Sequence, residues 1–194
     1  MIKTTKERPT TGVIGMLLML SCLLFAVTAQ AEHFKRTASG WLNQTEVDTN
    51  GNGIPLNSLT AFGKGTFGKS ASNDVGETGS FAGEFCEFFP PDVVIIRLPI
   101  ISRSSIIRFA NGDLLYATLA TDGPGSSLCI DVRNEMRTVE IHMLISGGTG
   151  KFEGATGRLL VTGNSTPVST EAGFPVHVAV TSVTQGEIYL QDDD

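Results

Sequence analysis

Long apolar runs, helical periodicity and clustered basic residues are all scarce in this sequence of 194 residues. Its one uncharged apolar run, Val13 to Val27, has about 15 residues, fewer than the ~20 that a helix needs to cross a bilayer. Beyond that run, no segment repeats apolar residues at the 3.6-residue period of an amphipathic helix. The sequence therefore predicts neither a membrane-spanning helix nor a helical fold.

The N-terminal residues have the three parts of a secretory signal peptide. A basic stretch precedes the apolar run, and the small residues of Ala29-Gln30-Ala31 follow it. We expect cleavage after Ala31, so that residues 1–31 are a signal peptide and the protein is secreted or periplasmic. Lipidation at Cys22 is the alternative, but Leu23 and the residues after it continue the apolar run, which a lipidated cysteine should end.

Basic residues are also few. The chain has 14 basic and 20 acidic residues, a net charge of −6. Losing the signal removes three basic residues and one acidic residue, which leaves 11 against 19, or −8. Nucleic acid and anionic membranes require clustered Lys and Arg, so neither is expected as a partner after cleavage.

Cysteine is rare: of the three in the chain, only Cys86 and Cys129 remain after cleavage. Two cysteines in one domain of an exported protein most simply form a disulfide. A pair of buried free thiols is the alternative.

Short apolar or alternating runs, separated by Gly, Asn, Asp and Pro, make up the rest of the chain. We predict strands over 59–70, 81–89, 93–101, 105–110, 113–121, 127–133, 136–146, 157–164 and 175–190. About eight strands without helices indicate an all-β barrel or sandwich. The expected organisation is an N-terminal extension over 32–58, one β domain over 59–190 and an acidic tail over 191–194.

Turn residues indicate which strands pair. Asn111-Gly112 between two apolar runs is a strong hairpin signal, because a type I′ turn needs positive φ at both central residues. Turns over 122–125 and 133–135 would continue an antiparallel meander. Pro90-Pro91 has to interrupt any ladder and so separates 81–89 from 93–101.

Alternation predicts which side chains share a face. Over 136–146, an apolar face is formed by Val139, Ile141, Met143 and Ile145. Over 81–89, Glu84 lies on the face of Cys86, so Glu84 either enters the interior with that cysteine or stays solvated on the outside. The run from Val93 to Ile96 is apolar on both faces, which predicts that it is covered or forms a subunit contact.

A glycine-rich segment over 145–157 is the most distinctive motif. A strand that enters Gly-Gly-x-Gly resembles a dinucleotide-binding turn, but the helix that such a turn requires would be broken by the later glycines. A structural role is therefore expected, in which the glycines form a tight turn, Phe152 plugs the barrel end and the next strand begins at 155–157. The turn glycines are Gly147, Gly148, Gly150, Gly154 and Gly157.

The string Gly-Gly-Thr-Gly-Lys-Phe-Glu-Gly-Ala-Thr-Gly over 147–157 resembles the corresponding hairpin of the allene oxide cyclase and dirigent barrel superfamily, especially its bacterial secreted members of unknown function. The resemblance is strong over 139–163 only. It implies an antiparallel, eight-stranded up-and-down barrel with a mostly apolar cavity, in a superfamily that includes cofactor-free cyclases. No catalytic residue can be transferred from this hairpin.

A second motif begins at Asp48. The residues Asp48, Asn50 and Asn52 occupy positions 1, 3 and 5 of an EF-hand-like calcium loop, with a glycine at position 6 and the carbonyl of Ile54 at position 7. Position 12 is Leu59, where such a loop needs a bidentate acid. A weak calcium site and a metal-free turn rich in Asx residues are the two alternatives.

No Ser-His-acid arrangement or metal-type cysteine spacing is recognisable, and His33, beside the cleavage site, is expected to be disordered. Two functions follow as hypotheses: a barrel that binds a hydrophobic small molecule, and a cofactor-free cyclase or isomerase with Glu84 and Arg97 as candidate catalytic residues. A homo-oligomeric assembly protein is a third hypothesis. Apart from the calcium alternative, no cofactor is expected.

Overall fold

The computed structural model describes residues 30–45, 47–86, 94–171 and 174–191. Its strands are β1 (Gln30–Gln44), β2 (Asn57–Gly65), β3 (Gly68–Thr78), β4 (Ile95–Phe109), β5 (Leu114–Leu119), β6 (Ser127–Asp131), β7 (Arg137–Gly148), β8 (Thr156–Glu171) and β9 (Phe174–Leu190). One short 3-10 helix, η1 (Gly150–Phe152), joins β7 to β8. The predicted all-β class is therefore confirmed.

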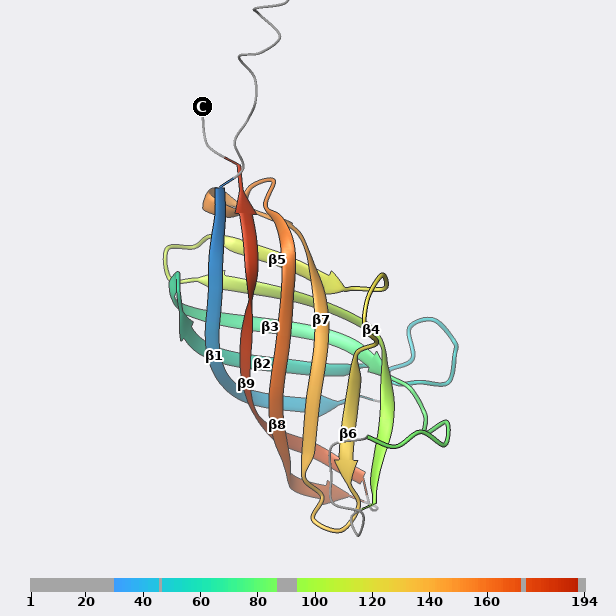
Figure 1. Ribbon diagram of the computed structural model, residues 1–194. Coiled ribbons are helices and arrows are strands. Elements are labelled where there is room, and N and C mark those ends of the chain that lie inside the picture. Colours follow the sequence, from blue (N-terminus) through green and yellow to red (C-terminus); the bar gives the residue numbers. More distant parts are fainter. Residues whose placement is uncertain (1–29, 46, 87–93, 172–173, 192–194) are drawn as a thin grey trace, which may run out of the picture.

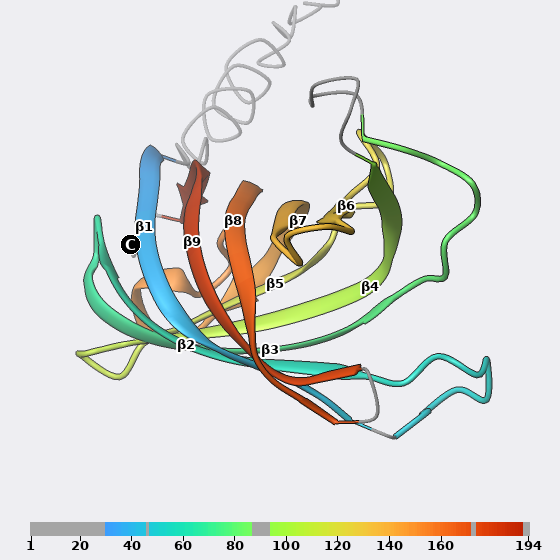
Figure 2. The ribbon, with the colours of Figure 1, turned by 90° about the horizontal axis from the view of Figure 1, so that it is seen from below.

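The strands close into an antiparallel barrel of eight strands. The circuit runs β1-β2-β3-β4-β5-β7-β8-β9 and returns to β1, and β6 pairs with the first parts of β4 and β7. In Figure 1, strands β1, β9, β8, β7 and β6 run lengthwise in one layer, while β2, β3, β5 and most of β4 cross behind them. Figure 2 shows β4 bending from the second layer towards the first.

One end of the barrel is filled by four phenylalanines. The ring of Phe152, on η1, stacks on Phe109 with centroids 4.8 Å apart and meets the edge of Phe67 at 5.1 Å. Phe34 of β1 stacks on Phe67 from the other side. Phe152 is buried, which confirms the predicted plug.

The glycine-rich segment is a turn, as predicted. Four of its five glycines have positive φ, a conformation that a residue with Cβ rarely adopts: Gly147, Gly150, Gly154 and Gly157. The following strand begins at Thr156. The predicted inward face of β7 is also confirmed, because Ile141, Met143 and Ile145 are buried.

β1 was not predicted. Residues 30–44 pair with both β2 and β9, so most of the predicted extension over 32–58 belongs to the barrel. His33, expected to be disordered, lies in β1 opposite Glu187. Alternation in β1 is hidden from a search for apolar residues, because its buried positions include Arg36 between Phe34 and Ala38.

Four of the predicted strands need correction. The segment 59–70 contains the end of β2 and the start of β3, joined at residues 66–67. The segments 93–101 and 105–110 belong to one strand, β4, because the polar residues between them continue its ladder with β3. Residues 81–86 form only an isolated bridge, Phe85 with Ile96, and 87–89 lie outside the described residues.

The Asn111-Gly112 hairpin is confirmed, since β4 and β5 pair on either side of it. The expected type I′ turn is not formed, because Gly112 has a positive φ of 97° and Asn111 does not. The meander predicted beyond it is confirmed only at its second turn: residues 133–135 lie between β6 and β7, which pair. The first step is wrong, because β5 pairs with β7 and β6 pairs with β4. Of the apolar run at 93–96, Ile95 is buried and Val94 is exposed. Val93 and the boundary at Pro90-Pro91 lie outside the described residues.

The predicted disulfide is present. Cys86 and Cys129 are bonded, with their Cα atoms 6.2 Å apart, so the segment before β4 is attached to β6. The predicted signal peptide up to residue 29, which includes Cys22, and residues 192–194 of the acidic tail lie outside the described residues. No helix in the described part of the chain is long and apolar enough to cross a membrane.

Candidate functional site

A cavity of about 450 Å³ lies inside the barrel, and residues from every strand line it. This size is within the range of pockets that hold small molecules. The lining extends to residues 54–55 and 78–80, which lie outside the strands or at the end of β3. The phenylalanine cluster fills the end that carries η1, so the free space lies beyond it along the barrel.

One wall of the cavity is apolar. It is formed by inward side chains of β7, β8 and β9, among them Ile141, Met143, Leu159, Val161 and Val178. In the middle of these strands the inward positions are aliphatic, as the pleat allows for a face turned away from water, while Ser165, Ser182 and Thr184 line the cavity farther along β8 and β9. An apolar ligand surface placed against this wall would be removed from solvent.

The opposite wall is polar, and Arg36 is at its centre. Only 4% of Arg36 is exposed, and its side chain crosses β2 to reach β3. Its Nε donates to the Ser70 hydroxyl at 2.8 Å and its Nη2 to the Ser72 hydroxyl at 3.2 Å. Gly63 of β2 makes the crossing possible, because a Cβ there would lie 2.9 Å from the Arg36 Nε.

Asp74 continues the polar wall towards β4. Its Oδ2 accepts a hydrogen bond from the Arg103 Nη2 at 3.3 Å, and both side chains are nearly buried. The other carboxylate oxygen, Oδ1, is buried, and no described residue forms a hydrogen bond with it. Burial lowers the pKa of the Arg36 guanidinium, and the negative charge of Asp74 partly opposes that shift.

Arg137, at the start of β7, is the third arginine that lines the cavity. Its Nε is buried and has no hydrogen-bond partner among the described residues. Burial lowers the pKa of its guanidinium, with a smaller opposing effect from Glu135. Arginine remains charged in proteins despite such shifts, so an unpaired charged donor lies at this cavity.

The cavity therefore carries positive charge inside an acidic protein. Its described lining contains three arginines, Arg36, Arg103 and Arg137, and one acidic residue, Asp74. Because a buried donor without a partner costs free energy, the site favours a ligand that supplies an acceptor. A negatively charged acceptor would also compensate the excess positive charge.

The catalytic candidates from the sequence do pair, but outside the barrel. The Arg97 Nη1 donates to the Glu84 Oε2 at 2.9 Å, and 63% of the Glu84 side chain is exposed. The interior position considered for Glu84 is therefore wrong. The reason is local: residues 81–86 are not a ladder strand, so the alternation that placed Glu84 beside Cys86 does not apply.

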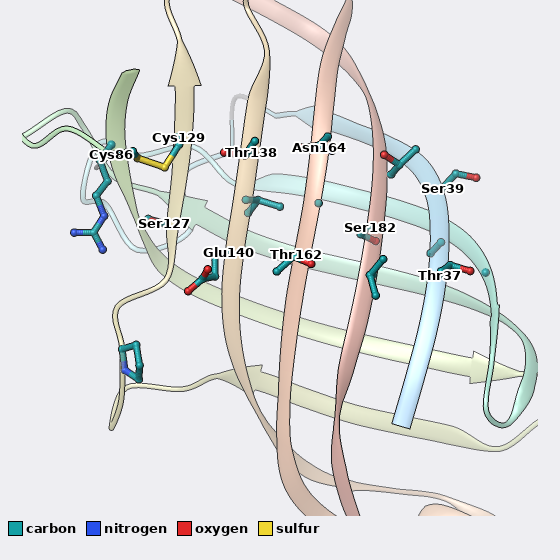
Figure 3. Close-up of a pocket in the computed structure, with 18 of the residues that line it drawn as sticks. Thr37, Ser39, Cys86, Ser127, Cys129, Thr138, Glu140, Thr162, Asn164 and Ser182 are labelled. Atoms are coloured by element: carbon teal, nitrogen blue, oxygen red, sulfur yellow. A yellow bond between two sulfur atoms is a disulfide. The ribbon is translucent and has the colours of Figure 1, made fainter. Parts of the chain in front are cut away.

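Arg97 belongs instead to an outer groove, defined here as the hollow on the outer face of β1, β9, β8, β7 and β6. Figure 3 shows the disulfide at one side and a row of polar side chains across the strands. The labelled polar residues are Thr37, Ser39, Ser127, Thr138, Glu140, Thr162, Asn164 and Ser182. Glu140 and Arg97 are the charged residues nearest the disulfide side, and no reactive constellation occurs among the described lining residues.

The Asp48 loop forms the hydrogen bonds of an Asx-rich turn. Asp48 accepts the backbone N–H groups of Asn50, Gly51 and Gly53, and these bonds, that of Gly53 foremost, lower the pKa of its carboxyl. Leu59, at position 12, is buried in β2 and cannot be a ligand.

The two strand histidines have separate neighbours and do not form a ligand pair. His142 contacts Glu140 at 3.1 Å, and His177 contacts Asn43 at 2.6 Å. Among the described residues, no group of three or more His, Cys, Asp and Glu side chains is placed to hold a metal.

The cavity charges were missed by sequence reasoning. Arg36 lies in an unpredicted strand, and Asp74 lies in β3, whose inward residues are small and polar. A usable signal was present in β1, where Arg36 has the same alternation phase as Phe34 and Ala38. No protein-family model, curated protein or solved structure was found to match this chain.

Proposed function

We propose that the barrel binds one small molecule with an apolar body and an anionic group. The observation that carries this proposal is the charge of the cavity lining, in which three arginines and one aspartate stand among mostly apolar side chains. The apolar wall would contribute about 25 cal/mol for each Å² of apolar ligand surface that it buries. The arginines would select for a carboxylate, sulfonate or phosphate, because a neutral ligand leaves the guanidinium unpaired.

A cofactor-free cyclase or isomerase is the second candidate, favoured by one observation. The Asp74 Oδ1 is buried without a partner at the cavity. A carboxylate in that position can accept a proton from a substrate, and nearby guanidinium groups stabilise developing negative charge. The closed barrel supports the resemblance to the allene oxide cyclase and dirigent superfamily, which remains a proposal.

The location of the protein is part of the same proposal. The Cys86–Cys129 disulfide indicates an oxidising compartment rather than the cytoplasm. Export by the N-terminal signal would bring the chain there. Mass spectrometry of the exported protein should show the loss of residues 1–31, and an intact N-terminus would contradict export by cleavage.

Two fluorescent probes of similar shape test the binding proposal: the anionic 1-anilinonaphthalene-8-sulfonate (ANS) and the neutral N-phenyl-1-naphthylamine. Both should bind in a one-to-one ratio, and the anionic probe should bind more tightly. Val161→Trp, which fills the cavity from the apolar wall, should weaken the binding of both probes. Arg137→Met should weaken the binding of the anionic probe by at least about tenfold and leave the binding of the neutral probe unchanged.

Arg108→Met is the matched control, because Arg108 carries the same charge on β4 but is exposed on the outside of the barrel. It should leave the binding of both probes unchanged. Equal loss of anion binding in the Arg108 and Arg137 variants would show that general charge, rather than the cavity, attracts the probe. Unchanged binding in Val161→Trp would show that the probes bind elsewhere.

A further inference from the structure

The Asp48 loop meets a buried acid from a distant part of the chain. Glu77, near the end of β3, lies against the loop, and its two carboxylate oxygens have separate contacts. The Asn50 Nδ2 is 3.0 Å from Oε1, and the Asn52 Nδ2 is 3.1 Å from Oε2. Residues at loop positions 3 and 5 are thus gathered around both oxygens of one glutamate.

Glu77 is a buried carboxylate without a positive partner. Only 4% of the residue is exposed, and no lysine, arginine or histidine of the described chain forms a salt bridge with it. Burying a carboxylate is costly unless an opposite charge or a metal compensates it. Its two contacts are carboxamides, which carry no charge, so the position calls for a cation.

We propose that Asp48, Asn50, Asn52, the Ile54 carbonyl and Glu77 form a calcium site. Glu77 supplies the acid that position 12 of the loop lacks, and it comes from β3 instead of from the loop itself. Calcium prefers six to eight oxygen ligands, and a bidentate glutamate is the usual closing ligand of such loops. The side-chain oxygens of Asn50 and Asn52 accept the backbone N–H groups of Asn52 and Ile54, at 3.1 and 2.7 Å, and each oxygen keeps a second lone pair for a cation.

The backbone of the loop agrees with this assignment. Gly53, at position 6, has a φ of 80°, the conformation that the sharp turn of a calcium loop requires. With two carboxylates and two carboxamides, the affinity should be that of extracellular modules, a Kd of about 0.1–1 mM.

The site adjoins the lining of the cavity but is independent of the proposed ligand. Ile54 provides the position 7 carbonyl, and the side chains of Ile54 and Pro55 line the cavity. Calcium would therefore fix this part of the lining. Failure of calcium binding leaves the arginine cavity untouched, and failure of probe binding leaves the calcium site untouched.

Calorimetric titration of the purified, chelator-treated protein with CaCl2 tests the site. We expect a saturable heat with one equivalent of calcium and a rise in melting temperature at about 5 mM CaCl2, with no comparable effect of MgCl2. Glu77→Gln should weaken binding at least tenfold. In chelator, its melting temperature should be equal to or above that of the original chain, because the substitution removes a buried charge.

Asp131→Asn is the matched control. Asp131 also accepts backbone N–H groups in an Asx turn, from Arg133 and Asn134, but has no buried glutamate opposite it. It should bind calcium as the original chain does. No heat up to about 10 mM calcium, or unchanged binding in Glu77→Gln, would overturn the proposal. If the Glu77→Gln variant does not fold, the Asp48→Asn variant is tested in its place, because Asp48 is exposed. Loss of its carboxylate should weaken calcium binding to the same extent.

Discussion

Replacing Asp74 by asparagine should lower stability and raise affinity for an anion at the same time. The substitution keeps the shape of the side chain and removes the one negative charge among the described residues that line the cavity. Asp74 is 12% exposed in its side chain and pairs with Arg103 at 3.3 Å. Breaking a buried pair of this kind costs about 3–5 kcal/mol, so the free energy of unfolding should fall by that order.

Anion binding should respond in the opposite direction. With an effective dielectric constant of about 20, removing a like charge at roughly 6–8 Å from a bound anion is worth about 2–3 kcal/mol. That corresponds to an affinity gain of about 30- to 150-fold for the anionic probe. The neutral probe should change little.

Urea unfolding followed by circular dichroism measures the first effect, and probe titration in buffer measures the second. ANS also binds loosened, partly folded states. One-to-one stoichiometry and an intact near-ultraviolet circular dichroism spectrum are therefore required of the variant. A folded Asp74→Asn protein that binds the anionic probe more weakly would refute the inference that positive potential in the cavity selects the ligand.

Three further outcomes are expected. The disulfide spans 43 residues, so replacing Cys86 and Cys129 by serine should lower the free energy of unfolding by about 4 kcal/mol in denaturant titrations; equal stability would contradict this. Phe152→Ala should cost about 3–5 kcal/mol yet leave probe affinity unchanged, since Phe152 lies in the filled end; a large loss of affinity would contradict that placement. In a carbon-13 carboxyl titration, Asp48 should titrate below its ordinary pKa of about 3.9. Because its folded pKa is depressed, its contribution to stability is present above about pH 4 and is lost as the pH falls through the folded value; a midpoint at or above the ordinary value would show that its backbone hydrogen bonds are absent.

Residues with local signals were predicted well. The Asn111-Gly112 turn and the glycine turn after β7 depend on backbone conformations that few residues adopt, so sequence alone locates them. β7 was recognised because its inward face is part of the apolar wall, so apolar residues recur at every second position of its sequence. The disulfide followed from a count of two cysteines.

The polar wall was not predictable by the same rules. β3 turns Ser70, Ser72 and Asp74 inward, so its inner face has no hydrophobic alternation to detect. A strand that lines a charged cavity breaks the pattern by which strands are recognised. Glu84 shows the converse error: alternation was applied to a segment that forms no regular ladder.

A cavity with unlike walls also distinguishes between mirror images. Arg36, Asp74 and Arg103 lie on one side and the aliphatic residues of β7 to β9 on the other, while the phenylalanine cluster prevents passage through the far end. A guest with one acidic end and a flat apolar body therefore settles in a single orientation. Under the proposed function, the two faces of such a body would meet different walls, and only one of them would be turned towards Asp74 at a time.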